Sequence, residues 1–238
     1  MSVVDSLKVK IYADGADREG VLEMYEKSYI QGFTTNPTLM RKAGIEDYES
    51  FARGILEVIS DRPISFEVFA DEFEEMERQA LEIAEWGDNV YVKIPITNTR
   101  QQSASGLIQR LSSQGVRLNI TAILALDQVQ EVAAAVENSP ACIVSVFAGL
   151  IADTGVDPIP IMKEALAILQ SVPNAELLWA SPREVLNIYQ ADAIGCDIIT
   201  ATNDLLQKLA LAGKDLAEYS LETVRMFYND AQKAGYEL

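Results

Sequence analysis

A lysine stands in the middle of an apolar segment, where its chemistry differs from that of a surface lysine. Lys93 lies in NVYVKIPIT, between Val92 and Ile94. Burial disfavours the charged form of a lysine, and a neutral amine can attack a ketone to form an iminium. The iminium withdraws electrons from the adjacent carbon–carbon bond, so that this bond can be cleaved. The position of Lys93 therefore predicts Schiff-base chemistry; the alternative is a side chain that reaches solvent from a strand edge.

Three further polar residues stand in equally apolar segments. Glu67 lies in ISFEVFA and Asn119 in VRLNIT, and Thr121 follows Asn119 at the spacing that puts both on one face of a strand. A carboxylate beside an iminium lysine can hold a water that carries protons, and a threonine hydroxyl can fix that water. We expect these residues to surround one pocket with Lys93. Alternatively, they form a satisfied polar group that closes an apolar layer.

Two more polar residues stand at the ends of expected strands, where loops begin and catalytic groups are commonly mounted. Asp14 ends a strand in IYADG, and Asn36 ends the next strand in TTNPT. Both side chains are candidates for the same pocket. Each could instead only cap the helix that follows it.

The segment WASPREVL predicts the start of a helix, with Ser181 as the N-cap and Pro182 at the first helical position. Arg183 would lie beside the exposed N–H groups of this helix, so that an anion could bind there. Barrel enzymes often hold a substrate phosphate at this place, after the seventh strand. Otherwise, Arg183 pairs with a surface carboxylate.

These polar residues need a scaffold of strands, and short β-rich segments alternate with longer amphipathic segments along the chain. The strand candidates are KVKIYA, FTTN, ISFEVFA, NVYVKIPIT, VRLNIT, ACIVSVF, AELLWA and CDIIT. Helical spacing of apolar residues follows each of them, at residues 17–29, 46–60, 71–86, 100–113, 127–137, 158–170, 183–192 and 203–211. This order predicts an α/β fold, a (β/α)8 TIM barrel, rather than an open doubly wound sheet, whose Gly-rich first turn is absent.

We expect a single barrel domain over residues 1–238, because no linker, repeat or low-complexity tract divides the chain. The tail at 214–238 has helical spacing and predicts additional C-terminal helices. The apolar face of this extension must pack on the barrel or on another subunit. A homo-oligomer is therefore expected.

The composition excludes several classes of function and partner. The formal net charge is -17, and no basic block offsets it, which argues against nucleic acid and anionic membranes as partners. The chain has no histidine and only two cysteines, so Ser-His-Asp catalysis and the usual zinc sites are not expected. Without an apolar membrane span or an exported leader, and with two isolated cysteines, a cytoplasmic location is expected.

Taken in order, TTNPT, SFEV, VKIPIT, LNITAI, SVFAG followed by IADTG, and ASPR resemble the transaldolase family, over about residues 8–210. The resemblance implies a transferase of the pentose phosphate pathway. In such an enzyme Lys93 would form an iminium with a ketose or ketose phosphate, an aldose would leave, and the retained dihydroxyacetone carbanion would add to an acceptor aldose. No cofactor and no metal are implied.

The resemblance also implies roles for the residues around Lys93. Asp14 would be the acid–base group at the bond being cleaved, while Glu67 and Thr121 would act through water. The dihydroxyacetone part of the substrate would be held by Asn36, Asn119 and Ser181. Arg183 would bind the far end, which is normally a phosphate.

One position departs from the family pattern, and it leaves the substrate open. Family members often carry an arginine after the glycine of SxFxG, whereas this chain has Leu150, and Val156 supplies no replacement charge. A sugar without a phosphate is therefore possible. The residue types of Glu67 and Asn119 resemble those of transaldolases more than those of the related fructose-6-phosphate aldolases. The aldolases typically have glutamine at the position of Glu67. The alternatives are an aldolase that releases dihydroxyacetone and a sugar-phosphate-binding barrel without turnover.

Overall fold

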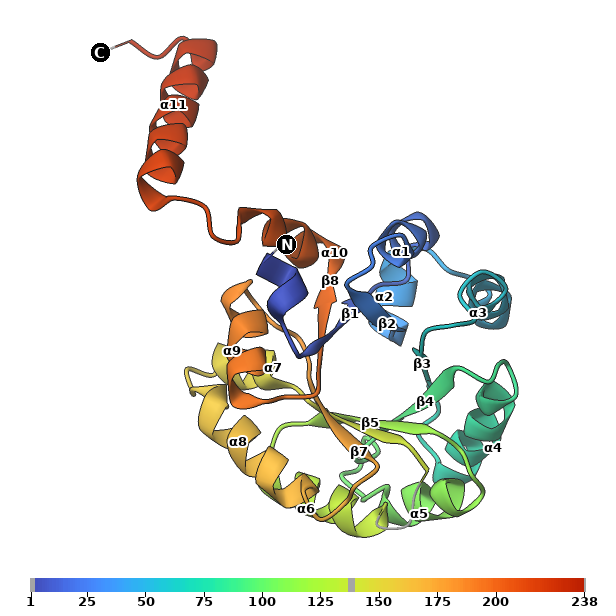
Figure 1. The fold of residues 1–238 in the computed structure, drawn as a ribbon. Helices are drawn as coiled ribbons and strands as arrows, with labels where there is room; N and C mark the ends of the chain where they lie inside the picture. The colour runs from blue at the N-terminus through green and yellow to red at the C-terminus, as the bar shows by residue number, and fades with distance from the viewer. Residues whose placement is uncertain (1–2, 137–139, 238) are drawn as a thin grey trace.

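Eight parallel strands close into a barrel, and helices surround it (Figure 1). The computed structural model describes residues 3–136 and 140–237. The strands are β1 Lys10–Asp14, β2 Ile30–Thr34, β3 Ile64–Glu67, β4 Val90–Pro95, β5 Leu118–Ile123, β6 Cys142–Val146, β7 Ala175–Trp179 and β8 Ile198–Thr202. Neighbours along the chain pair in parallel, and β1 also pairs with β8, which closes the sheet. The predicted (β/α)8 TIM barrel is confirmed, and all eight strand segments form strands.

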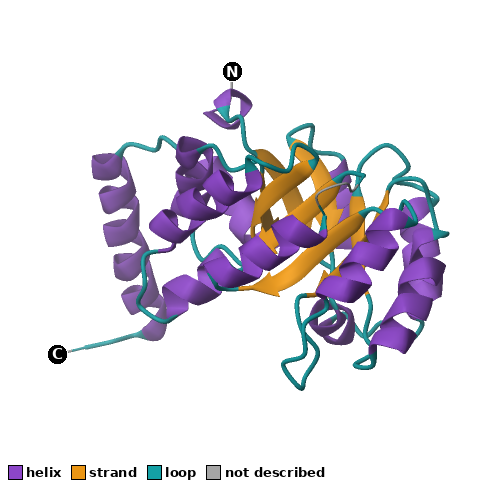
Figure 2. Cartoon of the chain, turned by 90° about the horizontal axis from the view of Figure 1, so that it is seen from below, coloured by secondary structure: helices purple, strands orange, loops and turns teal. Residues whose placement is uncertain are grey.

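Helices cover the outer face of the barrel, as Figure 2 shows from another side. The helical segments of the described chain are η1 Val3–Ser6, α1 Arg18–Tyr25, α2 Pro37–Lys42, α3 Tyr48–Leu56, α4 Phe73–Ala84, α5 Ser105–Ser113, α6 Leu126–Ala135, α7 Ala148–Asp153, α8 Pro158–Leu169, α9 Leu186–Ile194, α10 Asn203–Gln207, η2 Lys208–Leu211 and α11 Leu216–Ala234, of which α11 takes no part in this cover. Because both faces of the strands are covered, their residues are almost all buried; β6 is buried at every position.

The helices differ from the prediction in several places. Two short helices, α2 and α7, follow strand ends and lie outside the predicted helical segments. The helix predicted at 100–113 begins only at Ser105, because Gln101 has a φ of 60° and Asn98 accepts hydrogen bonds within a loop. The predicted helix at 127–137 corresponds to α6, and residue 137 lies outside the described residues.

Apolar side chains fill the lower part of the barrel interior and close it below the site. Tyr12, Ile143, Leu178 and Ile198 form one buried cluster there. A Cβ at Gly32 would lie 2.5 to 2.6 Å from the Tyr12 ring, so only glycine leaves room for this ring. Leu178 of this cluster also lines the cavity that holds the polar residues, so the cluster forms the floor of that cavity.

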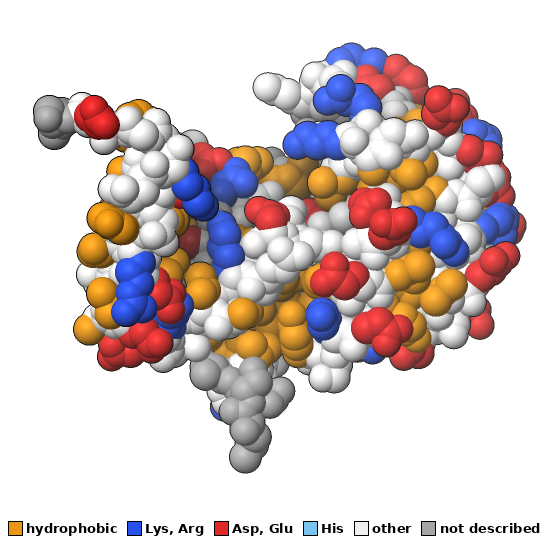
Figure 3. Space-filling view, turned by 90° about the horizontal axis from the view of Figure 1, so that it is seen from above, with side chains coloured by type: hydrophobic (Ala, Val, Ile, Leu, Met, Phe, Trp, Pro, Cys, Tyr) orange, Lys and Arg blue, Asp and Glu red, His pale blue; other side chains and the backbone are white. Residues whose placement is uncertain are grey.

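The last helix, α11, extends away from the barrel (Figure 1), and none of its residues is buried within the described part of the chain. Its hydrophobic side chains lie along the outer edge at the left of Figure 3. Leu216, Val224, Phe227 and Tyr228 expose between 59% and 81% of their surface. Of the two places predicted for this helix, packing on the barrel is therefore wrong.

Among the described residues, no helix is long and apolar enough to cross a membrane.

Candidate active site

Three of the predicted residues form one row across neighbouring strands. Glu67 on β3 pairs in register with Lys93 on β4, and Lys93 pairs in register with Asn119 on β5. Residues in register share a face of the sheet, so their side chains lie next to one another. The row therefore puts a carboxylate and an amide on the two sides of the lysine.

Lys93 points into the barrel and is only 6% exposed. Its Nζ lies 2.8 Å from Glu67 Oε2 and donates to the Thr35 carbonyl oxygen at 3.0 Å. The alternative, a side chain reaching solvent from a strand edge, is wrong. Removing two charges from water is costly unless they are paired, and the carboxylate of Glu67 supplies that partner.

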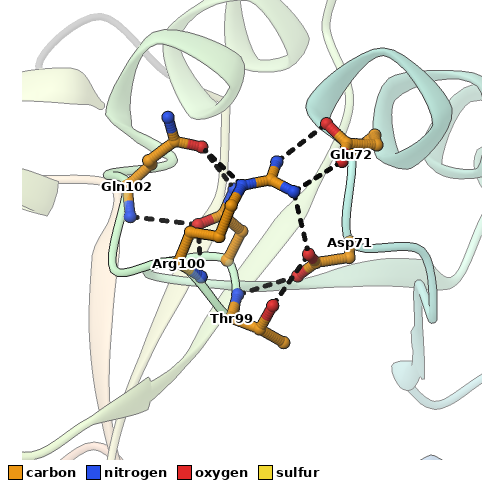
Figure 4. Close-up of polar contacts among 6 residues, drawn as sticks. Asp71, Glu72, Thr99, Arg100 and Gln102 are labelled. Atoms are coloured by element: carbon orange, nitrogen blue, oxygen red, sulfur yellow. Dashed lines mark hydrogen bonds and ion pairs between the residues drawn. The ribbon is translucent and has the colours of Figure 1, made fainter.

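The loops that follow Glu67 and Lys93 are tied together by a polar network (Figure 4). Thr99 donates to Asp71 through its backbone nitrogen at 2.7 Å and through its hydroxyl at 2.8 Å. Arg100 contacts both carboxylate oxygens of Glu72, at 2.6 and 2.8 Å. These contacts hold the pKa of Asp71 and the pKa of Glu72 below their ordinary values, by the hydrogen bonds from Thr99 and Arg100 respectively. The network connects the loops beyond β3 and β4.

Asn119 is fully buried and hydrogen-bonded on both sides. Its Nδ2 donates to Ser65 Oγ at 3.0 Å, and its Oδ1 accepts from Ser145 Oγ at 2.6 Å. This matches the alternative of a satisfied polar group, although Asn119 also lines the cavity around Lys93. The two serines fix the orientation of its amide.

Asp14 lies at the end of β1, and it does not cap α1, whose N-cap is Asp17. Its Oδ1 accepts from Thr34 Oγ1 at 2.7 Å, and the hydroxyls of Thr34 and Thr200 are 2.5 Å apart. Asp14 lines the cavity around Lys93. Burial raises the pKa of Asp14, and the negative charge of Glu67 adds to this, while Lys93 and the Thr34 hydrogen bond oppose it. A raised pKa suits a carboxyl group that exchanges protons.

Thr121 lies next to an irregularity in β5. Its Oγ1 is buried and has no hydrogen-bond partner among the described residues. The β5–β6 register shifts between Ile120 and Ile123, and Ala122 has a φ of 62°. Such strain at a non-glycine residue is common beside functional sites. The bulge gives both Thr121 and Ala122 a place in the cavity wall.

A cavity of about 700 Å³ opens above this floor at the carboxyl ends of the strands. Its walls include all eight of the predicted site residues, namely Asp14, Asn36, Glu67, Lys93, Asn119, Thr121, Ser181 and Arg183. The same end of other barrels carries the active site. Asn36 also caps α2, because its Oδ1 accepts from Leu39 N at 3.0 Å.

The predicted helix start at Ser181 is wrong. Ser181 has a φ of 57°, in the left-handed region, and α9 begins at Leu186. The backbone N–H groups of Arg183 and Glu184 donate to Asn187 Oδ1, at 2.7 and 3.1 Å. The helix N-terminus expected to bind an anion at this position is therefore absent, and these two N–H groups already have a partner.

The turn at Ser181 follows from its contact with α7. A Cβ at Gly149 would lie 1.5 Å from the Ser181 carbonyl oxygen, so the glycine of SVFAG allows α7 to approach this loop. The following residue, Leu150, lines the cavity near Arg183. Arg183 forms an ion pair with Asp153, which matches the surface-carboxylate alternative, and its Nε donates to Asp153 Oδ1 at 2.9 Å.

Several cavity residues were not predicted. The hydroxyls of Thr34, Ser145 and Thr200 line the cavity, and Lys42 contributes a second lysine. The hydroxyl residues lie inside apolar strand segments, which is the same signal that identified Glu67 and Asn119. Serine and threonine are common in strands for other reasons, so this signal is weak for them. Among the described residues, no cluster of acidic or cysteine side chains could hold a metal ion.

The sequence is similar to known proteins over most of its length. The family model described as transaldolase/fructose-6-phosphate aldolase matches residues 11–238. A protein of Dehalococcoides mccartyi named "probable transaldolase" is 34% identical, over 84% of this chain and 90% of that protein. One of Brucella anthropi with the same name is 31% identical, over 97% of this chain and 100% of that protein.

Solved structures share the fold at low sequence identity. The 3-keto-L-gulonate-6-phosphate decarboxylase of Vibrio cholerae matches with a TM-score of 0.54 at 13% identity, over 87% of this chain and 90% of that chain. At this identity the match concerns the barrel fold alone.

Proposed function

Because the chain belongs to the transaldolase/fructose-6-phosphate aldolase family, we propose that it is a transaldolase acting through a Schiff base on Lys93. It transfers a dihydroxyacetone unit from a ketose or ketose phosphate to an aldose acceptor. The observation that carries this proposal is the buried Lys93, 2.8 Å from Glu67 inside the cavity. The pentose phosphate pathway is the place that the resemblance implies for this reaction.

The first half of the reaction forms the iminium. The Lys93 amine adds to the ketose carbonyl carbon, and the carbinolamine loses its oxygen as water. Glu67 passes protons through a bound water, which can be held by the hydroxyl of Thr121, since this hydroxyl has no partner in the described part of the chain. Both side chains line the same cavity as Lys93, which supports these roles.

The second half cleaves and remakes a carbon–carbon bond. Asp14 takes the proton from the hydroxyl of the carbon being released, the electron pair of the breaking bond moves toward the iminium nitrogen, and an aldose leaves. The resulting enamine adds to an acceptor aldehyde, whose oxygen receives the proton from Asp14, and water then releases the product from Lys93. The raised pKa of Asp14 supports this exchange of one proton.

Four further residues are proposed to bind the substrate. Asn36, Asn119 and Ser181 hold the dihydroxyacetone part of the substrate, and Arg183 contacts the far end of the sugar, which is a phosphate in a ketose phosphate. All four line the cavity. The amide of Asn119 is oriented by its two serine partners, which supports a binding role with little loss of side-chain freedom.

Trapping with borohydride tests the proposed function. Incubation with a ketose donor and borohydride should add the reduced donor fragment to Lys93, as peptide mass spectrometry would show. Lys93→Met should abolish the adduct, whereas Lys42→Met is a matched control, because Lys42 lines the same cavity. An adduct on Lys42 instead of Lys93 would contradict the proposal.

The second candidate function is an aldolase that releases dihydroxyacetone to water, since the matched family includes both activities. The two differ in the fate of the enamine on Lys93. Product analysis with and without an acceptor aldehyde distinguishes them. Free dihydroxyacetone as the main product in the presence of acceptor would favour the aldolase.

We also propose that the chain associates with further copies of itself through α11. Every copy carries this helix with its large apolar side chains exposed, and burying them on a neighbour is favourable. A reducing cytoplasm is the proposed location, supported by the two buried free thiols of Cys142 and Cys196.

A further inference from the structure

The backbone of Glu67 lies at a place where the barrel lacks a strand partner. Pairing between β2 and β3 ends at Thr34 and Ser65, and the last hydrogen bond on this side runs from Thr35 N to Ser65 O. Beyond it the chain turns into α2. The N–H and C=O of one strand residue point to the same neighbouring strand, and those of the next residue point to the opposite neighbour. Ser65 and Glu67, two residues apart, therefore point to the same side. The N–H and C=O of Glu67 therefore face the side on which β2 has ended.

The hydroxyl of Tyr48 occupies this place. It accepts from Glu67 N at 2.8 Å and donates to Glu67 O at 2.9 Å. One phenol thus satisfies the two backbone groups that a continued β2 would otherwise bind. On the other side, Val68 N donates to Lys93 O at 3.1 Å, so the end of β3 is held from both directions.

The ring of Tyr48 is itself fixed by its surroundings. Tyr48 begins α3, which Asp47 caps through a hydrogen bond from Ser50 N at 2.9 Å. Its ring packs against Phe66, Phe69 and Trp86, with centroids 5.7 to 6.3 Å apart. Burial raises the pKa of Tyr48, so the hydroxyl keeps the proton that it donates.

Tyr48 lies behind the barrel wall rather than in the active site. It lines a separate cavity of about 420 Å³ with Phe69 and Trp86, and it is not part of the wall around Lys93. A substrate on Lys93 would not touch it. Its influence on the reaction must therefore pass through Glu67.

We propose that Tyr48 is a positioning residue, whose hydroxyl replaces the missing strand partner of Glu67 and thereby holds the Glu67 carboxylate against Lys93. The inference rests on the proposed function, because it assigns Tyr48 to the proton transfers that Glu67 performs during iminium formation. Without the hydroxyl, the end of β3 gains backbone freedom, and the carboxylate loses its fixed distance from Lys93.

The experiment compares the rate of adduct formation among variants. Dihydroxyacetone serves as the ketose, and borohydride trapping at timed intervals gives the rate for wild type, Tyr48→Phe, Glu67→Gln and the double variant. Tyr48→Phe should slow adduct formation roughly tenfold or more, with a smaller change in KM, and shift the pH profile toward that of Glu67→Gln. The double variant should be no slower than Glu67→Gln alone.

Two controls separate positioning from general stability. Tyr25→Phe removes a hydroxyl that bonds Asp61 at 3.0 Å and should leave rate and pH profile unchanged. Trp86→Phe loosens the packing around Tyr48 but keeps its hydroxyl, and it should lower the melting temperature without moving the pH profile. All rates are measured where melting curves show each variant folded.

The positioning role of Tyr48 and the proposed function are overturned by different outcomes. A wild-type rate in Tyr48→Phe, effects that multiply in the double variant, or a pH shift in Trp86→Phe would overturn the positioning role alone. Absence of any adduct in wild type would overturn the proposed function and this inference with it.

Discussion

Glu67 and Lys93 occupy facing positions on β3 and β4, and their charged groups meet 2.8 Å apart in the barrel interior. The side chains are 18% and 8% exposed, so neither charge has free access to bulk water. A pair in this environment can pass a proton over a short path, directly or through one water. Replacing Glu67 by glutamine removes this proton path.

Glu67→Gln should slow iminium formation roughly 100-fold or more, the usual effect of losing a general acid–base group. Glutamine has the same shape and can still contact Lys93, but it cannot take up a proton. Single-turnover trapping with borohydride measures the rate. The network residue Glu72 offers a control, since Glu72→Gln alters a carboxylate outside the cavity. An unchanged rate in Glu67→Gln would remove Glu67 from the mechanism.

Asp14→Asn should stabilise the fold at neutral pH while it lowers turnover. The pKa of Asp14 is raised in the folded state because of burial, so the unfolded chain ionises first as pH rises. As pH rises from the ordinary aspartate pKa, about 3.9, to the raised pKa of the folded state, the wild type loses stability. Urea unfolding should show no gain for Asp14→Asn at low pH and a full gain above the folded pKa. A gain in stability that is the same at every pH would contradict a raised pKa of Asp14 in the folded state.

Thr121→Val should separate activity from stability. The hydroxyl of Thr121 is buried without a partner among the described residues, so its replacement by a methyl group should leave the free energy of unfolding unchanged or raise it by up to about 1 kcal/mol. Adduct formation should slow, because the proposed water loses its contact. Thr34→Val is the matched control: it breaks bonds to Asp14 and Thr200 and should cost about 1 kcal/mol. A Thr121→Val variant that keeps wild-type rates would exclude the proposed water site.

Leu150→Arg should raise the preference for phosphorylated donors. Leu150 and Arg183 line the same cavity, and the charge of Arg183 is already paired with Asp153. One added cationic contact contributes about 1.5 to 3 kcal/mol, or roughly 10- to 100-fold in affinity. Relative kcat/KM for a ketose phosphate and its unphosphorylated ketose measures the change. Leu186→Arg adds the same charge at an exposed position on α9 and should leave that ratio as it is.

Phe227→Glu should dissociate the proposed oligomer without unfolding the barrel. Phe227 is 64% exposed on α11, and a carboxylate there would be buried without a partner in an apolar contact. Light scattering after size exclusion should change from a multiple of 26.2 kDa to that mass. Asn229→Glu is the control on the opposite side of the helix. A wild-type chain that already runs at the single-chain mass would contradict association through α11.

Much of the scaffold could be predicted from local patterns. A strand buried on both faces is almost wholly apolar, so Glu67, Lys93 and Asn119 were conspicuous by their type alone. The strand order and the register then follow from the closed barrel. Hydroxyl residues such as Thr34 and Thr200 carry no comparable signal, because threonine suits any strand.

The loops were less predictable, because long-range contacts decide them. The pattern at Ser181 and Pro182 is that of a helix start, yet Gly149 in α7 leaves space for the backbone of Ser181, which adopts a left-handed turn there. In the same way, nothing near Tyr48 in the sequence indicates Glu67, nineteen residues away. Both contacts exist only because the barrel brings distant segments together.

The sequence by itself determined the chemistry that this cavity can offer: a lysine, two carboxyl groups, amides and hydroxyls, and no histidine. Residue types and their strand positions are local properties, and they are read directly from the chain. Only the tertiary structure decided distances and partners, including the pairing of Arg183 with Asp153 and the support of Glu67 by Tyr48. Such contacts depend on the closure of the barrel, which no short stretch of sequence contains.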